Sequence, residues 1–123
     1  MKTIREVADL FGVSTRTVRY YEELGLIRPE RSEGNIRLYG SRDMAKLKLV
    51  FRGKRFGFSL EEIKEMVLLF DLDRSGKKQL ERTVEYGHQR IAEIEEKIIE
   101  LEEMKDEMKG LLLEFEQKLR EKG

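Results

Sequence analysis

The sequence predicts a mainly α-helical protein: four short helices and one β-hairpin, followed by a single long coiled-coil helix. Three observations support this prediction. Capped amphipathic segments of helical period recur through the first 70 residues, one Pro- and Gly-containing turn cluster interrupts them, and a heptad pattern occupies the last third. With 41% charged and 39% hydrophobic residues, the chain fits a small core with a long solvated helix better than a sphere.

The first two predicted helices are short and closely spaced. Thr3 and Glu6 form a capping-box pattern before apolar residues spaced i, i+3, i+4, i+7 across residues 4–11. After a Gly-containing turn, Ser14 is placed to cap a second helix over residues 15–23. This helix is expected to bury two residues three apart, Val18 and Tyr21. The spacing is that of a helix-turn-helix over residues 3–24.

A β-hairpin is predicted for residues 26–39. The only proline, Pro29, lies there, and residues 32–35 form a turn cluster flanked by extended stretches at 26–28 and 36–39. A hairpin directly after a helix-turn-helix corresponds to a wing.

A helix pair is predicted for residues 41–70. Ser41 is placed to cap its first helix, Gly57 to end it, and Ser59 opens the second helix with another capping box. The inward-facing residues are expected to be Met44, Leu47, Val50, Phe51, Ile63, Met66, Val67 and Phe70. Residues 1–72 would then form one domain.

The remaining segment, residues 75–121, is predicted to be a dimerisation helix. From Leu80 onwards, ten of twelve positions spaced alternately four and three apart are apolar, Gly87 and Lys105 being the exceptions. Such a stripe needs a partner helix, which we expect to be a second copy; the alternative is that the helix folds back on its own domain. The expected dimer-interface residues are Val84, Ile91, Ile94, Ile98, Leu101, Met108, Leu112 and Phe115.

The zero net charge conceals two halves of opposite sign. Residues 1–59 carry 13 basic and 7 acidic residues, whereas residues 60–123 carry 12 and 18. A basic front half suggests a nucleic-acid-binding face, although ordinary solvated surface is the alternative.

Composition excludes several classes. There is no cysteine for a disulfide, thiolate metal site or nucleophile, and the lone His88 is expected at the surface. We expect no enzyme, cofactor or metal site, because no catalytic constellation is present. No apolar run or signal peptide points to a membrane, so a cytoplasmic, nucleoid-associated protein is expected.

The second helix carries the strongest functional pattern. If Val18 and Tyr21 face the core, four residues face outward: Thr15, Arg16, Arg19 and Tyr20. Arginine can pair with a guanine edge or clamp a phosphate, and tyrosine can hydrogen-bond a phosphate oxygen.

These residues carry a resemblance to a known family. The run Thr17-Val18-Arg19-Tyr20-Tyr21-Glu22, followed by Leu24-Gly25-Leu26-Ile27 and Pro29, resembles the signature of MerR bacterial transcription regulators. Arg37-Leu38-Tyr39 and the stretch from Gly57 to Ile63 extend the resemblance over about residues 3–70.

The resemblance implies a homodimer, joined by an antiparallel coiled coil, that regulates transcription. It would bind a two-fold symmetric site in double-stranded promoter DNA, beside RNA polymerase, and bend and untwist the duplex. By matching position, further DNA contacts would come from Arg37 and Tyr39 of the hairpin and from Arg52, Lys54 and Arg55 of a second wing.

The chain also departs from better-known family members. It lacks the cysteines of the metal-sensing branch, and it ends with the coil, where the drug-sensing branch adds a ligand-binding domain. The effector is left open: a small molecule, a protein partner or none. An alternative function is an architectural or DNA-anchoring protein whose coil recruits a partner.

Overall fold

The computed structural model describes residues 1–123 and divides them into two compact units, Met1–Thr83 and Val84–Gly123. The architecture is mainly α-helical, as predicted, with five helices and a two-stranded antiparallel sheet. In chain order the elements are α1 (Ile4–Phe11), α2 (Thr15–Glu23), β1 (Glu30–Arg31), β2 (Arg37–Leu38), α3 (Ser41–Arg55), α4 (Leu60–Leu72) and α5 (Lys77–Lys122). None of these helices combines the length and apolar character needed to cross a bilayer.

Helices α1 and α2 begin where the sequence predicts. Thr3 and Glu6 exchange the two hydrogen bonds of a capping box, and the Ser14 hydroxyl accepts a hydrogen bond from the backbone of Thr17. Val18 and Tyr21 are both buried, which confirms the predicted inner face of α2.

The hairpin is shorter than predicted and starts later. Leu26 and Ile27, expected in the first strand, are buried core residues outside any strand. Their segment does not join the ladder, because the N–H of Arg28 donates to the Asp43 side chain and Pro29 has no N–H to donate. The paired residues are Glu30 with Leu38 and Arg31 with Arg37.

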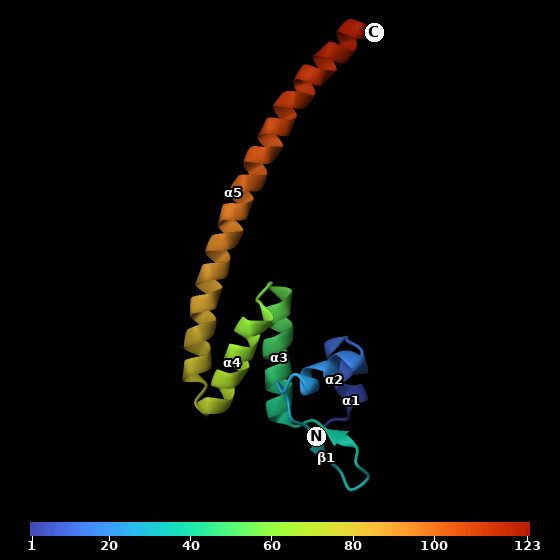
Figure 1. Cartoon of the computed structure of the whole chain (residues 1–123), viewed down its shortest axis with the longest axis vertical. Helices are drawn as coiled ribbons and strands as arrows, with labels where there is room; N and C mark the ends of the chain where they lie inside the picture. Colours follow the sequence, from blue (N-terminus) through green and yellow to red (C-terminus); the bar gives the residue numbers. More distant parts are fainter. The chain divides into compact units, whose positions relative to one another are not determined.

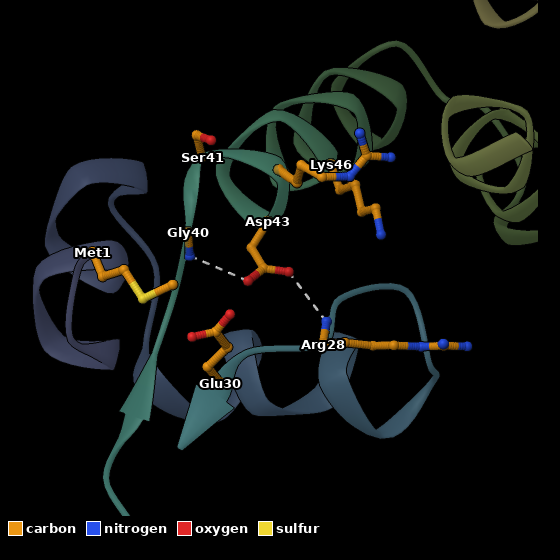
Figure 2. Close-up of a pocket in the computed structure, with 8 residues that line it drawn as sticks. Met1, Arg28, Glu30, Gly40, Ser41, Asp43 and Lys46 are labelled. Atoms are coloured by element: carbon orange, nitrogen blue, oxygen red, sulfur yellow. Dashed lines mark hydrogen bonds between the residues drawn. The ribbon is translucent and has the colours of Figure 1, made fainter. Parts of the chain in front are cut away.

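Helix α3 begins differently from the sequence prediction. Gly40, rather than Ser41, is the N-cap residue. The buried carboxylate of Asp43 accepts hydrogen bonds from the N–H groups of Gly40, at 3.3 Å, and Arg28, at 3.1 Å (Figure 2). Because one carboxylate satisfies two backbone donors, it joins the segment before the hairpin to the helix after it.

Helix α3 lies between the α1–α2 pair and α4 (Figure 1). The ring of Phe51 packs at a tilt against Phe11 of α1, with centroids 5.0 Å apart, and edge-to-face against Tyr21 of α2, at 5.6 Å. Of the eight residues expected to face inward from the helix pair, Leu47, Val50, Ile63, Met66 and Val67 are buried, and the other three are intermediate. The core of the first unit therefore forms around α3.

An ion-pair cluster also holds α4 to α3. Asp71 accepts from Lys46 at 2.7 Å and from Arg42 at 3.1 Å, and Lys46 is buried. Burial alone would raise the pKa of Asp71, but the hydrogen bonds from Lys46 and Arg42 bring that pKa below its ordinary value. The carboxylate thus stays ionised and compensates the buried ammonium group.

The first turns of α5 belong to the first unit. Arg82 donates to Glu65 of α4 at 2.7 Å, and the Thr83 hydroxyl lies 3.3 Å from the sulfur of Met66. The structural boundary consequently falls after Thr83, within a helix, whereas the sequence suggested a boundary at residue 72.

Candidate nucleic-acid interface

Helix α2 separates its buried and exposed residues cleanly. Val18 and Tyr21 anchor it to the core, whereas Arg16, Arg19 and Tyr20 are exposed. These three exposed residues and Glu23 line a shallow surface depression. Thr15 is intermediate in exposure, and its hydroxyl lies 3.5 Å from an Arg19 Nη, so these two side chains follow the same helix face. The four candidate residues of α2 thus share one outward surface.

The hairpin brings two arginines into register. Arg31 of β1 stands opposite Arg37 of β2, and both reach toward Glu22 at the end of α2. The Nε of Arg37 donates to the Glu22 carboxylate at 2.6 Å, while an Nη of Arg31 lies 3.9 Å from the other oxygen. Sequence reasoning assigned no role to Glu22, because its partners are 9 and 15 positions away.

Tyr39 does not lie on this surface. Its side chain is only 1% exposed and its hydroxyl oxygen is buried without a hydrogen-bond partner. Burial raises the pKa of Tyr39, and the nearby charge of Glu22 raises that pKa further. Its backbone forms a bridge to Lys2. The expected DNA contact from this side chain is therefore not compatible with its position, and Tyr39 is a core residue.

The basic residues of the predicted second wing cluster at the end of α3. Arg52, Lys54 and Arg55 are all exposed. Their cluster surrounds Gly53, which is buried against Ile63 of α4. The ammonium group of Lys54 lies 5.8 Å from the centre of the Tyr21 ring in α2. The turn between α3 and α4 is thus a compact, positively charged projection.

A separate pocket, lined in part by basic residues, lies at the start of α3 (Figure 2). Three of its five charged side chains pair within the chain: Asp43 accepts from backbone N–H groups, and both Arg42 and Lys46 pair with Asp71. These contacts are part of the packing of the hairpin segment and α4 on α3.

The expected dimer-interface residues of α5 are exposed in the single chain. Their exposed fractions run from 46% for Ile94 to 62% for Leu101. No group of three or more His, Asp or Glu side chains is arranged to hold a metal ion.

Two family models match the sequence. One, described as MerR HTH family regulatory protein, matches residues 2–68, and the other, described as MerR, DNA binding, matches residues 44–111. Together the two matches cover the helix-turn-helix, the hairpin, the α3–α4 pair and most of α5.

Individual relatives agree. The chain is 41% identical over 109 residues to heavy metal-dependent transcription regulator 2 of Rhizobium meliloti strain 1021, covering 88% of this chain and 72% of the relative. A solved regulator, PbrR691 of Ralstonia metallidurans CH34 in complex with lead(II), is 31% identical with a TM-score of 0.64, over 88% and 83% of the two chains. HiNmlR, a regulator lacking the sensor domain and bound to promoter DNA, is 25% identical with a TM-score of 0.62, over 85% and 78%.

Proposed function

Because the chain belongs to the MerR family of transcription regulators, which bind DNA, we propose that it acts as a homodimer on a two-fold symmetric promoter site. The observation that carries this proposal is the outward surface of α2. Arg16, Arg19 and Tyr20 are exposed together, on a helix held rigidly by two buried residues. Such a helix has the size and donor groups to read a major groove.

The proposed DNA contacts are of two types, to base edges and to phosphates, and they come from different elements. Arg16 and Arg19 read base edges, whereas Arg37 of the hairpin and the cluster of Arg52, Lys54 and Arg55 hold phosphates on either side. Phosphate contacts fix register and affinity without carrying sequence information, so both kinds are needed for a specific regulator.

Dimerisation is assigned to α5. Its heptad stripe is exposed along its whole length, and burying it against an antiparallel second copy would remove that apolar surface from water. A homodimer presents two copies of α2 to the duplex, so its site has two-fold symmetry. Bending and untwisting that site beside RNA polymerase is the proposed mode of regulation, in the cytoplasm on the nucleoid.

A metal effector does not fit this chain. The names of the Rhizobium and Ralstonia relatives refer to heavy metal and lead(II). Here the thiolate donors that a soft metal prefers are missing, because the sequence has no cysteine, and no cluster of carboxylates and histidine takes their place. We therefore derive no metal-dependent step.

The experiment is DNA binding across salt concentration. A duplex recovered by selection from random sequence with the unaltered chain serves as the site, and a scrambled duplex of equal length serves as the reference. Arg19→Ala should cost about 1–3 kcal/mol on the selected site and little on the scrambled one. Lys54→Ala should weaken both alike and reduce the salt slope by about one.

Lys118→Ala, near the end of α5, removes the same charge far along the chain and is the control. Equal losses on both duplexes for Arg19→Ala would remove the base-reading role from α2. An unaltered chain with no preferred duplex would defeat the proposed function itself.

A further inference from the structure

We infer that Glu22 is a specificity-determining positioning residue. Its carboxylate pairs with Arg31 and Arg37, holds the hairpin wing against helix α2 and orients the guanidinium group of Arg37. The inference rests on the proposed function, since it concerns how the same surface reads DNA. It goes further by assigning a role to an acidic residue that itself repels the phosphate backbone.

The hairpin requires a nearby negative charge. Arg31 and Arg37 are directly opposite each other in the ladder, and like charges in opposite positions destabilise a strand pair. Each strand has only two paired residues, too few to hold the hairpin alone. The two oxygens of Glu22 each face one of the arginines, at 3.9 and 2.6 Å, so a single carboxylate compensates the repulsion.

The geometry at Arg37 also orients its remaining donors. The Nε–H group is taken by Glu22, which fixes the plane of the guanidinium and leaves its four Nη hydrogens free. A charge-assisted bond of 2.6 Å is short, and both partners are about three-quarters shielded, with side-chain exposures of 30% and 23%. The pairing is therefore screened less by salt than a fully exposed ion pair.

The position of Glu22 links two DNA-reading elements. It lies one residue after the buried anchor Tyr21, on the helix that carries Arg16 and Arg19. Through it, the hairpin is tied to the base-reading side chains and not only to the rest of the core. Because α2 is anchored in the core, this ion pair restrains the wing relative to α2, so phosphate and base contacts are made in a fixed relative geometry.

This role predicts opposite effects on two kinds of DNA. Without the carboxylate, Arg31 and Arg37 become free to bind phosphates in any register, and one negative charge is removed from the interface. Affinity for non-site DNA should rise, whereas the preference for the site should fall. A carboxylate that merely stabilised the fold would instead lower both affinities.

The test compares Glu22→Gln with Glu33→Gln in the full-length chain, using the selected and scrambled duplexes. Glu33 is the matched control, because it is exposed in the turn of the hairpin and makes no ion pair. We expect Glu22→Gln to bind the scrambled duplex about threefold more tightly, with a salt slope steeper by one to two. The ratio of selected to scrambled affinity should fall about tenfold. Glu33→Gln should raise both affinities alike and leave the ratio unchanged.

A double-mutant cycle with Arg37→Gln completes the test. If Glu22 acts through Arg37, the double variant should lose no more preference than Arg37→Gln alone. Equal changes for Glu22→Gln and Glu33→Gln, or losses that add in the double variant, would overturn the inference. An unaltered chain without a preferred duplex would defeat the proposed function first, and that outcome is seen before any variant is made.

Discussion

Gly53 shows how a single residue shapes the second wing. It is buried in α3, where a Cβ atom would come within 2.8 Å of Ile63 Cγ1 and 3.1 Å of its Cδ1. The absence of a side chain thus allows α4 to approach α3 at the point where Arg52 and Lys54 project. The position of the basic cluster depends on this close contact.

Gly53→Ala should therefore destabilise the protein by about 1–3 kcal/mol, because overpacking forces Ile63 or the helices apart. The matched control is Gly110→Ala in α5, where a Cβ meets nothing within 4 Å and alanine should gain up to about 1 kcal/mol as the better helix former. Thermal unfolding at one fixed protein concentration measures both. A neutral Gly53→Ala would show that α3 and α4 can separate without cost.

At the residue scale, sequence reasoning identified exposed side chains better than paired ones. Arg16, Arg19 and Tyr20 follow from helical period once Val18 and Tyr21 are taken as buried. The burial of Tyr39 and the pairing of Glu22 could not be predicted in this way. Both depend on where the hairpin packs against α2, and the local spacing of apolar residues in the sequence gives no information about that contact.

At the level of elements, the helices with side-chain caps were predicted well. Thr3, Ser14 and Ser59 all cap the helices expected of them, because a cap is a local hydrogen bond between residues three apart. The start of α3 and the first strand were predicted less well. Both are determined by Asp43, whose carboxylate takes the backbone donor of Arg28 from 15 positions away.

Two neighbouring residues of α5 allow a matched test of the proposed dimer interface. Ile98 and Ile99 are adjacent and similarly exposed, at 50% and 56%, but they face directions about 100° apart on the helix. Only Ile98 is on the heptad stripe. Ile98→Asp should therefore convert the dimer to a monomer in sedimentation, whereas Ile99→Asp should stay dimeric.

The same pair tests the link between dimerisation and DNA binding. Losing the second recognition helix should weaken binding to the selected duplex by about 100-fold or more, since bivalent contact raises avidity by 10²–10⁴. Ile99→Asp should bind nearly as the unaltered chain does. If Ile98→Asp remained dimeric, the heptad stripe of α5 would not be the dimer interface.

At the scale of the whole molecule, the boundary between the basic and acidic parts of the sequence differs from the boundary between the two structural units. The basic excess lies in residues 1–59, but the compact first unit continues to Thr83. The acidic α4 and the first turns of α5 are thus packed with the DNA-binding elements. Arg82 and Glu65 join these two helices by an ion pair, so the start of the coil is fixed to the second wing.

This connection gives a physical basis for DNA distortion. If each α5 is tied to a wing at its start and to a partner helix beyond, the two wings of the dimer have a fixed separation. A duplex whose straight geometry did not match that separation would have to bend or untwist to contact both wings. Bending a site of 20–30 base pairs costs about 1–6 kcal/mol, which several phosphate contacts can offset.

Transcription in vitro tests distortion as the mode of regulation. The template is the promoter that carries the selected site, with a second version shortened by about two base pairs between its polymerase-binding elements, equivalent to roughly 70° of twist. If the protein untwists an over-long spacer, the shortened promoter should be active without protein, and added protein should repress it or have no effect. Ile98→Asp, which cannot couple two wings, should fail to activate the full-length promoter. If the shortened promoter were silent and the protein still activated it, distortion would not be the mechanism, and recruitment of polymerase through a protein contact would explain activation better.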